Sequence, residues 1–192
     1  MTVSARRHES GVLPRPAARG LVARTLDCPI GPLLVVAGPR GILRAAFGEE
    51  DPDRVVEQAS QASVAASAPG AAPRERASVR TVDAFARELD AYFDGRLRTF
   101  TTPVDLPLVG GFARRVLEST ARIPYGVVAT YGELAKRAGS PRGGRAAGNA
   151  LHRNPVPILI PCHRVVPAGG GLGGYGGCEE RKAMLLALEE SL

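Results

Sequence analysis

The sequence predicts a two-part α/β (α+β) protein, in which an N-terminal sheet with a helix precedes a mainly helical C-terminal domain. Short apolar runs separated by turn residues fill positions 21–47, whereas later apolar residues recur at helical spacing. The chain has 192 residues, 44% of them hydrophobic, which is enough for one good core or two small ones. The expected divisions are a mobile basic tail (1–20), an N-terminal domain (21–100) with a flexible loop (59–78), a connection (101–106) and a C-terminal domain (107–192).

The N-terminal region reads as a tail followed by strands. Residues 1–20 hold arginines and prolines without an apolar period, which is typical of a mobile segment. Turns are expected at Ile30-Gly31-Pro32 and at Gly38-Pro39-Arg40-Gly41. Apolar, partly β-branched runs flank both turns, so we expect a β-hairpin pattern of strands between Leu21 and Phe47. Cys28 precedes the first turn, and we expect a structural role for it.

Helices are expected on both sides of the flexible loop. Residues 51–58 suit a short helix. Residues 59–78 are rich in Ala, Ser, Pro and Gln and lack an apolar period, which indicates a surface loop or linker. Residues 79–95 form a further helix that ends at a glycine. Its apolar face consists of Val82, Phe85, Ala86, Leu89 and Phe93.

The C-terminal domain contains the pattern of a helix-turn-helix. A helix over 110–123 should point Phe112, Val116 and Leu117 inward. Thr130-Tyr131-Gly132-Glu133 matches a capping box, and the helix that it begins should end near Gly139. Ser140-Pro141 then suits the start of another helix, over 142–152. Two short helices joined by a glycine-containing turn indicate a helix-turn-helix.

The second of these helices has an unusual composition. It contains three glycines, which together cost it about 2–3 kcal/mol of helix propensity relative to alanine. Such small residues allow a close approach, either to a neighbouring helix or to a nucleic-acid groove. In the second case Arg142 and Arg145 would project toward the nucleic acid.

Positive charge gathers in the same part of the chain. The formal net charge is +6, which by itself is also expected of any protein from an arginine-rich proteome. Residues 107–153 carry all of this excess, since their eight cationic side chains face only Glu118 and Glu133. The eight are Arg114, Arg115, Arg122, Lys136, Arg137, Arg142, Arg145 and Arg153. A local excess of this kind is typical of a nucleic-acid face.

Other classes of protein leave no signal in the sequence. The three cysteines, Cys28, Cys162 and Cys178, form no metal-binding spacing, and their odd number favours reduced thiols. We therefore expect no metal and no cofactor. No apolar stretch is long enough to span a membrane, and the N-terminus lacks the apolar core of a signal peptide. We expect a cytoplasmic protein without a membrane partner.

The chemistry is expected where an apolar run meets a thiol and an imidazole. Ile158 to Ile160 suits a short buried strand or a core-filling segment, and Pro161 stiffens its exit. Cys162 and His163 follow directly, as a potential nucleophile and base. The alternative is that Cys162 is a small buried hydrophobe, which is the commoner role of a lone cysteine.

The last part of the chain is a glycine-rich loop and a helix. Residues 167–177 hold seven glycines and Tyr175, which suits either a flexible loop or a backbone wrapped around a flat base. In the helix over 179–192 we expect Met184, Leu185 and Leu188 to pack inward. Glu189 lies on the same side and needs a buried partner, whereas Glu190 faces outward.

Pro161-Cys162-His163-Arg164-Val165 resembles the active-site signature of the O6-alkylguanine-DNA alkyltransferases, the methylated-DNA–protein-cysteine methyltransferases. Asn154-Pro155 and Gly173–Gly177 stand where that family has similar elements. The resemblance is good from about Pro103 to Glu189 and weaker over 21–100. It implies a ribonuclease-H-like N-terminal domain and a winged helix-turn-helix-like C-terminal domain.

The resemblance also implies a role for each site residue. Cys162 would be the nucleophile, with His163 as base through a bridging water and Glu189 holding His163. Tyr131 would donate a proton to the leaving base, and Asn154 would brace the turn before the active site. DNA would be contacted by Arg145 (the arginine finger), Arg142, Ala146, Ala147 and Tyr131. The base would be held by Cys162, Val165, Tyr175, Gly176 and Gly177.

The implied function is direct-reversal DNA repair. An alkyl group would pass once from O6-alkylguanine, and also from O4-alkylthymine, to Cys162 after the base leaves the duplex. The partner would be double-stranded DNA on the nucleoid, bound by a monomer that could cluster along it. Three rivals stay open, namely a non-catalytic alkylated-DNA-binding protein, a cysteine hydrolase and a transcription regulator.

Overall fold

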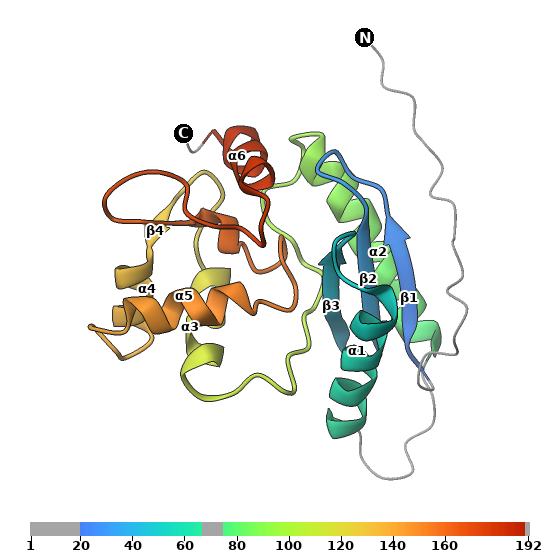
Figure 1. Cartoon of the computed structure of the whole chain (residues 1–192). Helices are drawn as coiled ribbons and strands as arrows, with labels where there is room; N and C mark the ends of the chain where they lie inside the picture. The colour runs from blue at the N-terminus through green and yellow to red at the C-terminus, as the bar shows by residue number, and fades with distance from the viewer. Residues whose placement is uncertain (1–19, 67–74, 191–192) are drawn as a thin grey trace.

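The N-terminal half is built on a three-stranded antiparallel sheet. The computed structural model describes residues 20–66 and 75–190 (Figure 1). The strands β1 (Val22–Leu26), β2 (Leu33–Gly38) and β3 (Gly41–Phe47) lie side by side in chain order. Leu26 pairs with Leu33 and Leu34 pairs with Ala46, so both turns lie where the glycines and prolines predicted them. The expected basic tail, apart from Gly20, lies outside the described residues.

Two helices cover the two faces of this sheet (Figure 1). They are α1 (Pro52–Ala66) and α2 (Glu75–Phe93). Every residue of β2 is buried, because its side chains alternate between a cluster with α2 and a cluster with α1. Leu33 and Val35 belong to the first cluster, and Leu34 and Val36 to the second.

The flexible loop expected over 59–78 is wrong for its described residues. Helix α1 continues to Ala66 and α2 already begins at Glu75, while residues 67–74 lie outside the described part. Val55, Ala59 and Ala62 recur at helical spacing and are buried against the sheet. Alanine is too small to mark an apolar period clearly in a sequence, yet it packs closely and favours a helix.

Backbone hydrogen bonds join the two halves along the edge of β3. The Ile42 N–H donates to Pro103 O at 2.8 Å, and the Asp105 N–H donates to Ile42 O at 2.9 Å. The Ala45 N–H donates to Pro155 O at 2.8 Å. Gly41 permits this close approach, since a Cβ there would lie 2.6 Å from Pro103 O. The connection and the turn before the active site are therefore both fixed to the N-terminal sheet.

The C-terminal half packs helices around two very short strands. The helices are α3 (Gly111–Ala121), α4 (Tyr131–Arg137), α5 (Gly144–His152) and α6 (Glu179–Leu188), with a single 3₁₀ turn, η1, at Cys162–Arg164. The strands β4 (Ala129–Thr130) and β5 (Val165–Val166) pair in parallel. The predicted capping box is present at Thr130 and Glu133. Within the part of the chain that the model describes, no helix is long and apolar enough to cross a membrane.

Two local expectations for this half are wrong, and for a third the structure decides between the two alternatives. Helix α5 begins at Gly144, because Ser140 closes a turn by accepting the Gly143 N–H at 2.8 Å. The run from Ile158 to Ile160 is a buried turn, in which Ile158 has a φ of 74°, so the core-filling alternative holds. Met184 is 48% exposed, since the buried face of α6 is formed by Lys182, Leu185 and Leu186, and Met184 lies on the other side of the helix.

Candidate active site

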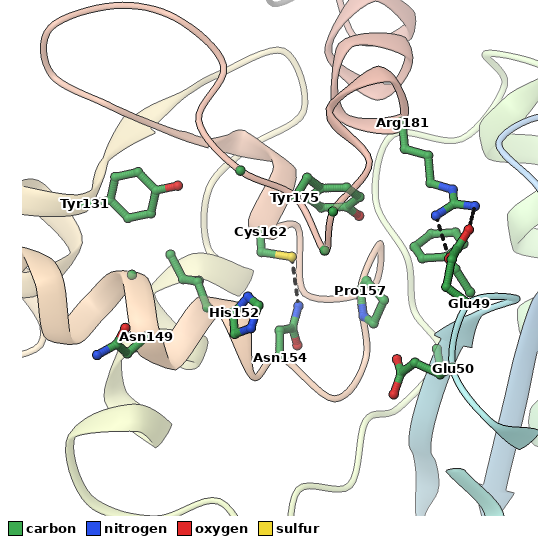
Figure 2. Close-up of a pocket in the computed structure, with 17 residues that line it drawn as sticks. Glu49, Glu50, Tyr131, Asn149, His152, Asn154, Pro157, Cys162, Tyr175 and Arg181 are labelled. Atoms are coloured by element: carbon green, nitrogen blue, oxygen red, sulfur yellow. Dashed lines mark hydrogen bonds and ion pairs between the residues drawn. The ribbon is translucent and has the colours of Figure 1, made fainter. Parts of the chain in front are cut away.

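A cavity of about 540 Å³ lies between the two halves of the protein. Figure 2 shows that its walls come from the end of β3, from α4 and α5, from the loop before α6 and from α6 itself. Six of the residues expected at the site line it: Tyr131, Asn154, Cys162, Tyr175, Gly176 and Gly177. The fold thus brings together residues that are up to 46 positions apart in the sequence.

The Cys162 thiol faces this cavity and is held by Asn154. The Asn154 Nδ2 atom lies 3.1 Å from Cys162 Sγ and also donates to Ile160 O at 2.9 Å (Figure 2). Asn154 Oδ1 accepts the Val156 N–H at 3.2 Å, so this one side chain spans the whole buried turn. Burial raises the pKa of Cys162, while the Asn154 hydrogen bond and the charge of Lys182 oppose that rise.

His163 lies beneath the cavity and pairs with Glu189. It is fully buried, and its Nε2 atom lies 3.0 Å from Glu189 Oε1. Its other ring nitrogen, Nδ1, has no hydrogen-bond partner within the described protein. Burial lowers the pKa of His163 against the opposing effect of Glu189, so the imidazole is neutral at physiological pH.

Glu189 is the centre of a buried polar network. Arg164 binds it with two nitrogens, Nε to Oε2 and one terminal nitrogen to Oε1, each at 2.8 Å. The Tyr92 hydroxyl donates to Oε1 at 2.6 Å. Burial alone would raise the pKa of Glu189, but the hydrogen bonds from His163, Arg164 and Tyr92 lower it to about 2. The carboxylate is therefore ionised, as an inward Glu with charged partners must be.

Sequence reasoning missed three residues of this site. Arg164, Lys182 and Tyr92 are all buried, and the first two carry a charge. Arg164 was signalled by its place beside His163 and by the need of Glu189 for a partner. Lys182 lies seven positions before Glu189 on the same face of α6, and it donates to Val165 O at 2.6 Å. Tyr92 stands three positions after Leu89 on the buried face of α2, so helical spacing could place it inward, but only the tertiary structure brings it to Glu189.

Tyr175 and two glycines form one wall of the cavity. Tyr175 is 8% exposed, and its ring packs against Phe47 with 6.4 Å between the centroids. Burial, and then the neighbouring Cys162, raise the pKa of its phenol. Gly176 has a φ of 56°, and a Cβ there would meet no atom within 4 Å. The wall is thus rigid at Tyr175 and open beside it.

Arg181 fixes this wall to the N-terminal half. Its guanidinium binds Glu49 Oε1 and Oε2 at 2.5 and 2.8 Å, and its Nε donates to Ile30 O at 2.8 Å (Figure 2). It also stacks over Phe47 at 4.4 Å from the ring centroid. Phe47 in turn contacts Tyr175, so the two halves hold the cavity wall between them.

Val165 does not lie where the resemblance placed it. It is fully buried and does not line the cavity. Its N–H donates to Cys162 O, and its carbonyl accepts the Lys182 ammonium. Val165 therefore supports the thiol from below, because the 3₁₀ turn and β5 direct its backbone groups into the protein.

The expected DNA-contacting residues separate into an outer and an inner group. Arg142, Arg145 and Ala146 are exposed around the start of α5. Ala147 is fully buried in the core and has no surface to offer, because it lies on the face of α5 that packs inward. Tyr131 is half-buried at the start of α4 and also lines the cavity.

The glycines of α5 face α4. A Cβ on Gly148 would lie 3.7 Å from the Tyr131 ring, and one on Gly144 would lie 4.0 Å from the Gly132 nitrogen, and both are ordinary van der Waals distances. The spacing of the two helices therefore does not require glycine at these two positions. The exposed face of α5 carries Arg145 and Ala146.

Two of the eight cations of residues 107–153 have structural partners. Arg114 pairs with Glu118, and Arg115 donates to Ala138 O. Among the described residues no group of three or more metal-ligating side chains could hold an ion.

Comparison with known proteins connects this geometry to one family. The model of the 6-O-methylguanine DNA methyltransferase ribonuclease-like domain matches residues 21–106, and that of the DNA binding domain of the same proteins matches residues 111–191. The methylated-DNA–protein-cysteine methyltransferase of Mycobacterium leprae is 40% identical over 168 residues, which are 87% of this chain and 91% of the relative. That of Methanosarcina acetivorans is 45% identical over 105 residues, 55% of this chain and 67% of the relative.

Solved structures show the same likeness in three dimensions. Mycobacterium tuberculosis O6-methylguanine methyltransferase superposes with a TM-score of 0.69 at 36% identity, over 89% of this chain and 93% of the other. A structure of the M. tuberculosis protein in complex with DNA gives 0.68 at 37% identity, over 88% and 92%.

Proposed function

Because the chain belongs to the 6-O-methylguanine DNA methyltransferase family, we propose that it repairs alkylated DNA by moving the alkyl group from guanine O6 to Cys162. The observation that carries this assignment is the thiol of Cys162, which faces a cavity large enough for a base and is backed by the His163–Glu189 pair. The non-catalytic damage-binding rival has no use for a thiol in that position.

The reaction is a displacement at carbon. Cys162 Sγ attacks the alkyl carbon, the S–C bond forms, the C–O6 bond breaks, and its electron pair goes to the guanine. His163 accepts the thiol proton at Nδ1 through a water, since Nε2 is occupied by Glu189. In the net reaction sulfur gains the alkyl group and guanine gains the proton.

Tyr131 and Asn154 assist this displacement. The Tyr131 hydroxyl supplies a proton to the departing base, and burial, which raises the pKa of this phenol, keeps it protonated until then. Asn154 holds Sγ by its amide and thereby aims the attacking sulfur. The thioether product is stable and nothing removes it, so each molecule acts once.

The duplex binds through the exposed side of α5. Arg145 and Ala146 lie there and Arg142 lies in the turn just before it, while Asn149 of the same helix lines the cavity. The thiol is inside the cavity, so the alkylated base must leave the helix to reach it, and Arg145 fills the space that it leaves. All these side chains come from one chain, so a monomer is sufficient for the reaction.

The test is intact-protein mass spectrometry after mixing with a duplex that carries one O6-methylguanine, followed by peptide mapping. We expect the mass of one methyl group on the Cys162 peptide, saturating at one per protein. Cys162→Ser should bind the same duplex and gain nothing. An unchanged wild-type mass with DNA binding would establish the damage-binding rival, and turnover of small esters would establish the hydrolase.

A further inference from the structure

A tyrosine of the N-terminal half touches the catalytic carboxylate. Tyr92 lies in the last turn of α2, is fully buried, and donates its hydroxyl to Glu189 Oε1 at 2.6 Å. The same oxygen lies 3.0 Å from His163 Nε2. One carboxylate oxygen of Glu189 therefore contacts both the base of the reaction and Tyr92, which lies 97 positions before Glu189 in the chain.

The geometry points to Tyr92 as a positioning residue of the alkyl-transfer site: its hydroxyl shares Glu189 Oε1 with His163 and limits the charge that this oxygen offers to the imidazole, so that the N-terminal domain sets how readily His163 takes the Cys162 proton. This inference rests on the alkyl transfer proposed above. It gives the N-terminal domain a part in the chemistry, because α2 reaches the reacting thiol through Glu189 and His163.

The Tyr92 ring is held firmly by other aromatic rings. It packs against Phe93 and Phe100 with 5.2 Å between centroids, and against Tyr125 at 6.1 Å. Burial, and then Glu189, raise the pKa of its phenol, so the hydroxyl is protonated and donates at neutral pH. Tyr92→Phe keeps these ring contacts and removes only the hydroxyl.

The hydroxyl controls how much negative charge Oε1 offers to His163. A neutral donor on a carboxylate oxygen draws electron density away from the other groups that share that oxygen. Without it, Glu189 binds the protonated form of His163 more strongly, and the pKa of His163 rises. Among the described residues, the groups with charge or a titratable proton that also face this pair include Arg164, Lys182, Tyr125, Tyr175 and Cys162, and the substitution changes none of these five.

The fall of the transfer rate at low pH, the acid limb of the pH–rate profile, reports the pKa of His163. Burial raises the pKa of Cys162 and lowers that of His163, so the resting pair is a thiol and a neutral imidazole. Protonation of His163 at lower pH removes the base and stops the reaction. Tyr92→Phe should move the midpoint of this limb upward by about 0.5 pH unit, which lowers the rate constant below the midpoint about 3-fold.

The experiment measures single-turnover methyl transfer from an O6-methylguanine duplex at saturating DNA, between pH 5 and 9. Tyr125→Phe is the matched control, because its hydroxyl donates to the Leu188 carbonyl at 2.8 Å and not to the Glu189 carboxylate. A structural loss would reduce the active fraction without moving the limb. An unmoved limb in Tyr92→Phe, or an equal shift in Tyr125→Phe, would overturn the inference.

A double-variant cycle gives an independent readout. In a Glu189→Gln background the Tyr92 hydroxyl no longer tunes a carboxylate, so adding Tyr92→Phe should leave the rate within about 1.5-fold. If Tyr92→Phe changes the rate by the same factor in the wild type and in Glu189→Gln, the coupling between Tyr92 and Glu189 is refuted. Wild-type protein that transfers no methyl group would instead refute the proposed function itself.

Discussion

Replacement of Glu189 by glutamine should cost the protein a stability that depends on pH. Glu189 is 1% exposed, and hydrogen bonds to its ionised form lower its pKa from an ordinary 4.5 to about 2. A carboxyl group with a lowered pKa binds fewer protons in the folded state than in the unfolded chain. Its contribution is therefore complete above pH 5 and is lost as the pH falls toward 2.

The size of this contribution follows from the shift. A difference of about 2.5 pKa units corresponds to about 3 kcal/mol of stability at pH 7. Glu189→Gln should therefore be about 3 kcal/mol less stable than the wild type at pH 7, since it also leaves Arg164 facing a neutral amide. The gap should narrow by about 1 kcal/mol at pH 4 and by about 2 kcal/mol at pH 3.

Urea unfolding followed by far-ultraviolet circular dichroism measures this gap, because the chain has no Trp for fluorescence. Glu190→Gln is the matched control, since the neighbouring carboxylate is exposed. Its stability should stay within about 0.5 kcal/mol of the wild type at every pH. A gap for Glu189→Gln that is constant from pH 7 to pH 3 would refute the buried ionised network.

Two further substitutions should change methyl transfer or DNA binding while leaving the stability of the fold nearly unchanged. Lys182→Met should transfer methyl groups about 10-fold more slowly at pH 7, because the Lys182 charge lowers the pKa of Cys162. Its stability in urea should stay within about 1 kcal/mol of the wild type, because the substitution removes both the cost of burying the Lys182 charge and the hydrogen bond to Val165 O. Equal transfer rates in Lys182→Met and the wild type would contradict the role of this charge. Arg145→Ala should weaken binding of the lesion duplex about 10-fold in a titration at fixed salt and leave stability unchanged. Arg96 is an exposed cation after α2, and Arg96→Ala should bind the duplex as the wild type does. Equal losses of affinity in the two variants would show that Arg145 is not part of the interface.

The local chemistry of the chain determined most of its elements. Glycine and proline at positions 30–32 and 38–41 placed both turns of the sheet, because few other residues adopt those backbone conformations. Thr130 and Glu133 placed the start of α4 by a capping box that needs only neighbours in sequence. The alanines of 59–66 were misread, since a small side chain shows its role only when a partner surface is present.

The sequence predicted most of the residues of the active site, but not which residues they contact. Cys162, His163 and Asn154 are close in sequence, so their chemistry and spacing could be read together. An inward Glu189 could be expected from the helical period, but its partners come from two other elements, Tyr92 from α2 and His163 and Arg164 from η1. Val165 and Ala147 were misplaced because the inward or outward direction of a single side chain depends on how its segment is packed.

The sequence by itself determined the nucleophile, the base, the basic helix-turn-helix and the strands of the N-terminal sheet, since each depends on residues that are neighbours along the chain. Only the tertiary structure decided that Arg164 and Tyr92 share the Glu189 carboxylate and that Arg181 joins the cavity wall to the first domain. The physical reason is that an ionised group is stable inside a protein only when buried donors converge on it. Which donors converge is set by the packing of distant segments, which no local pattern of residues records.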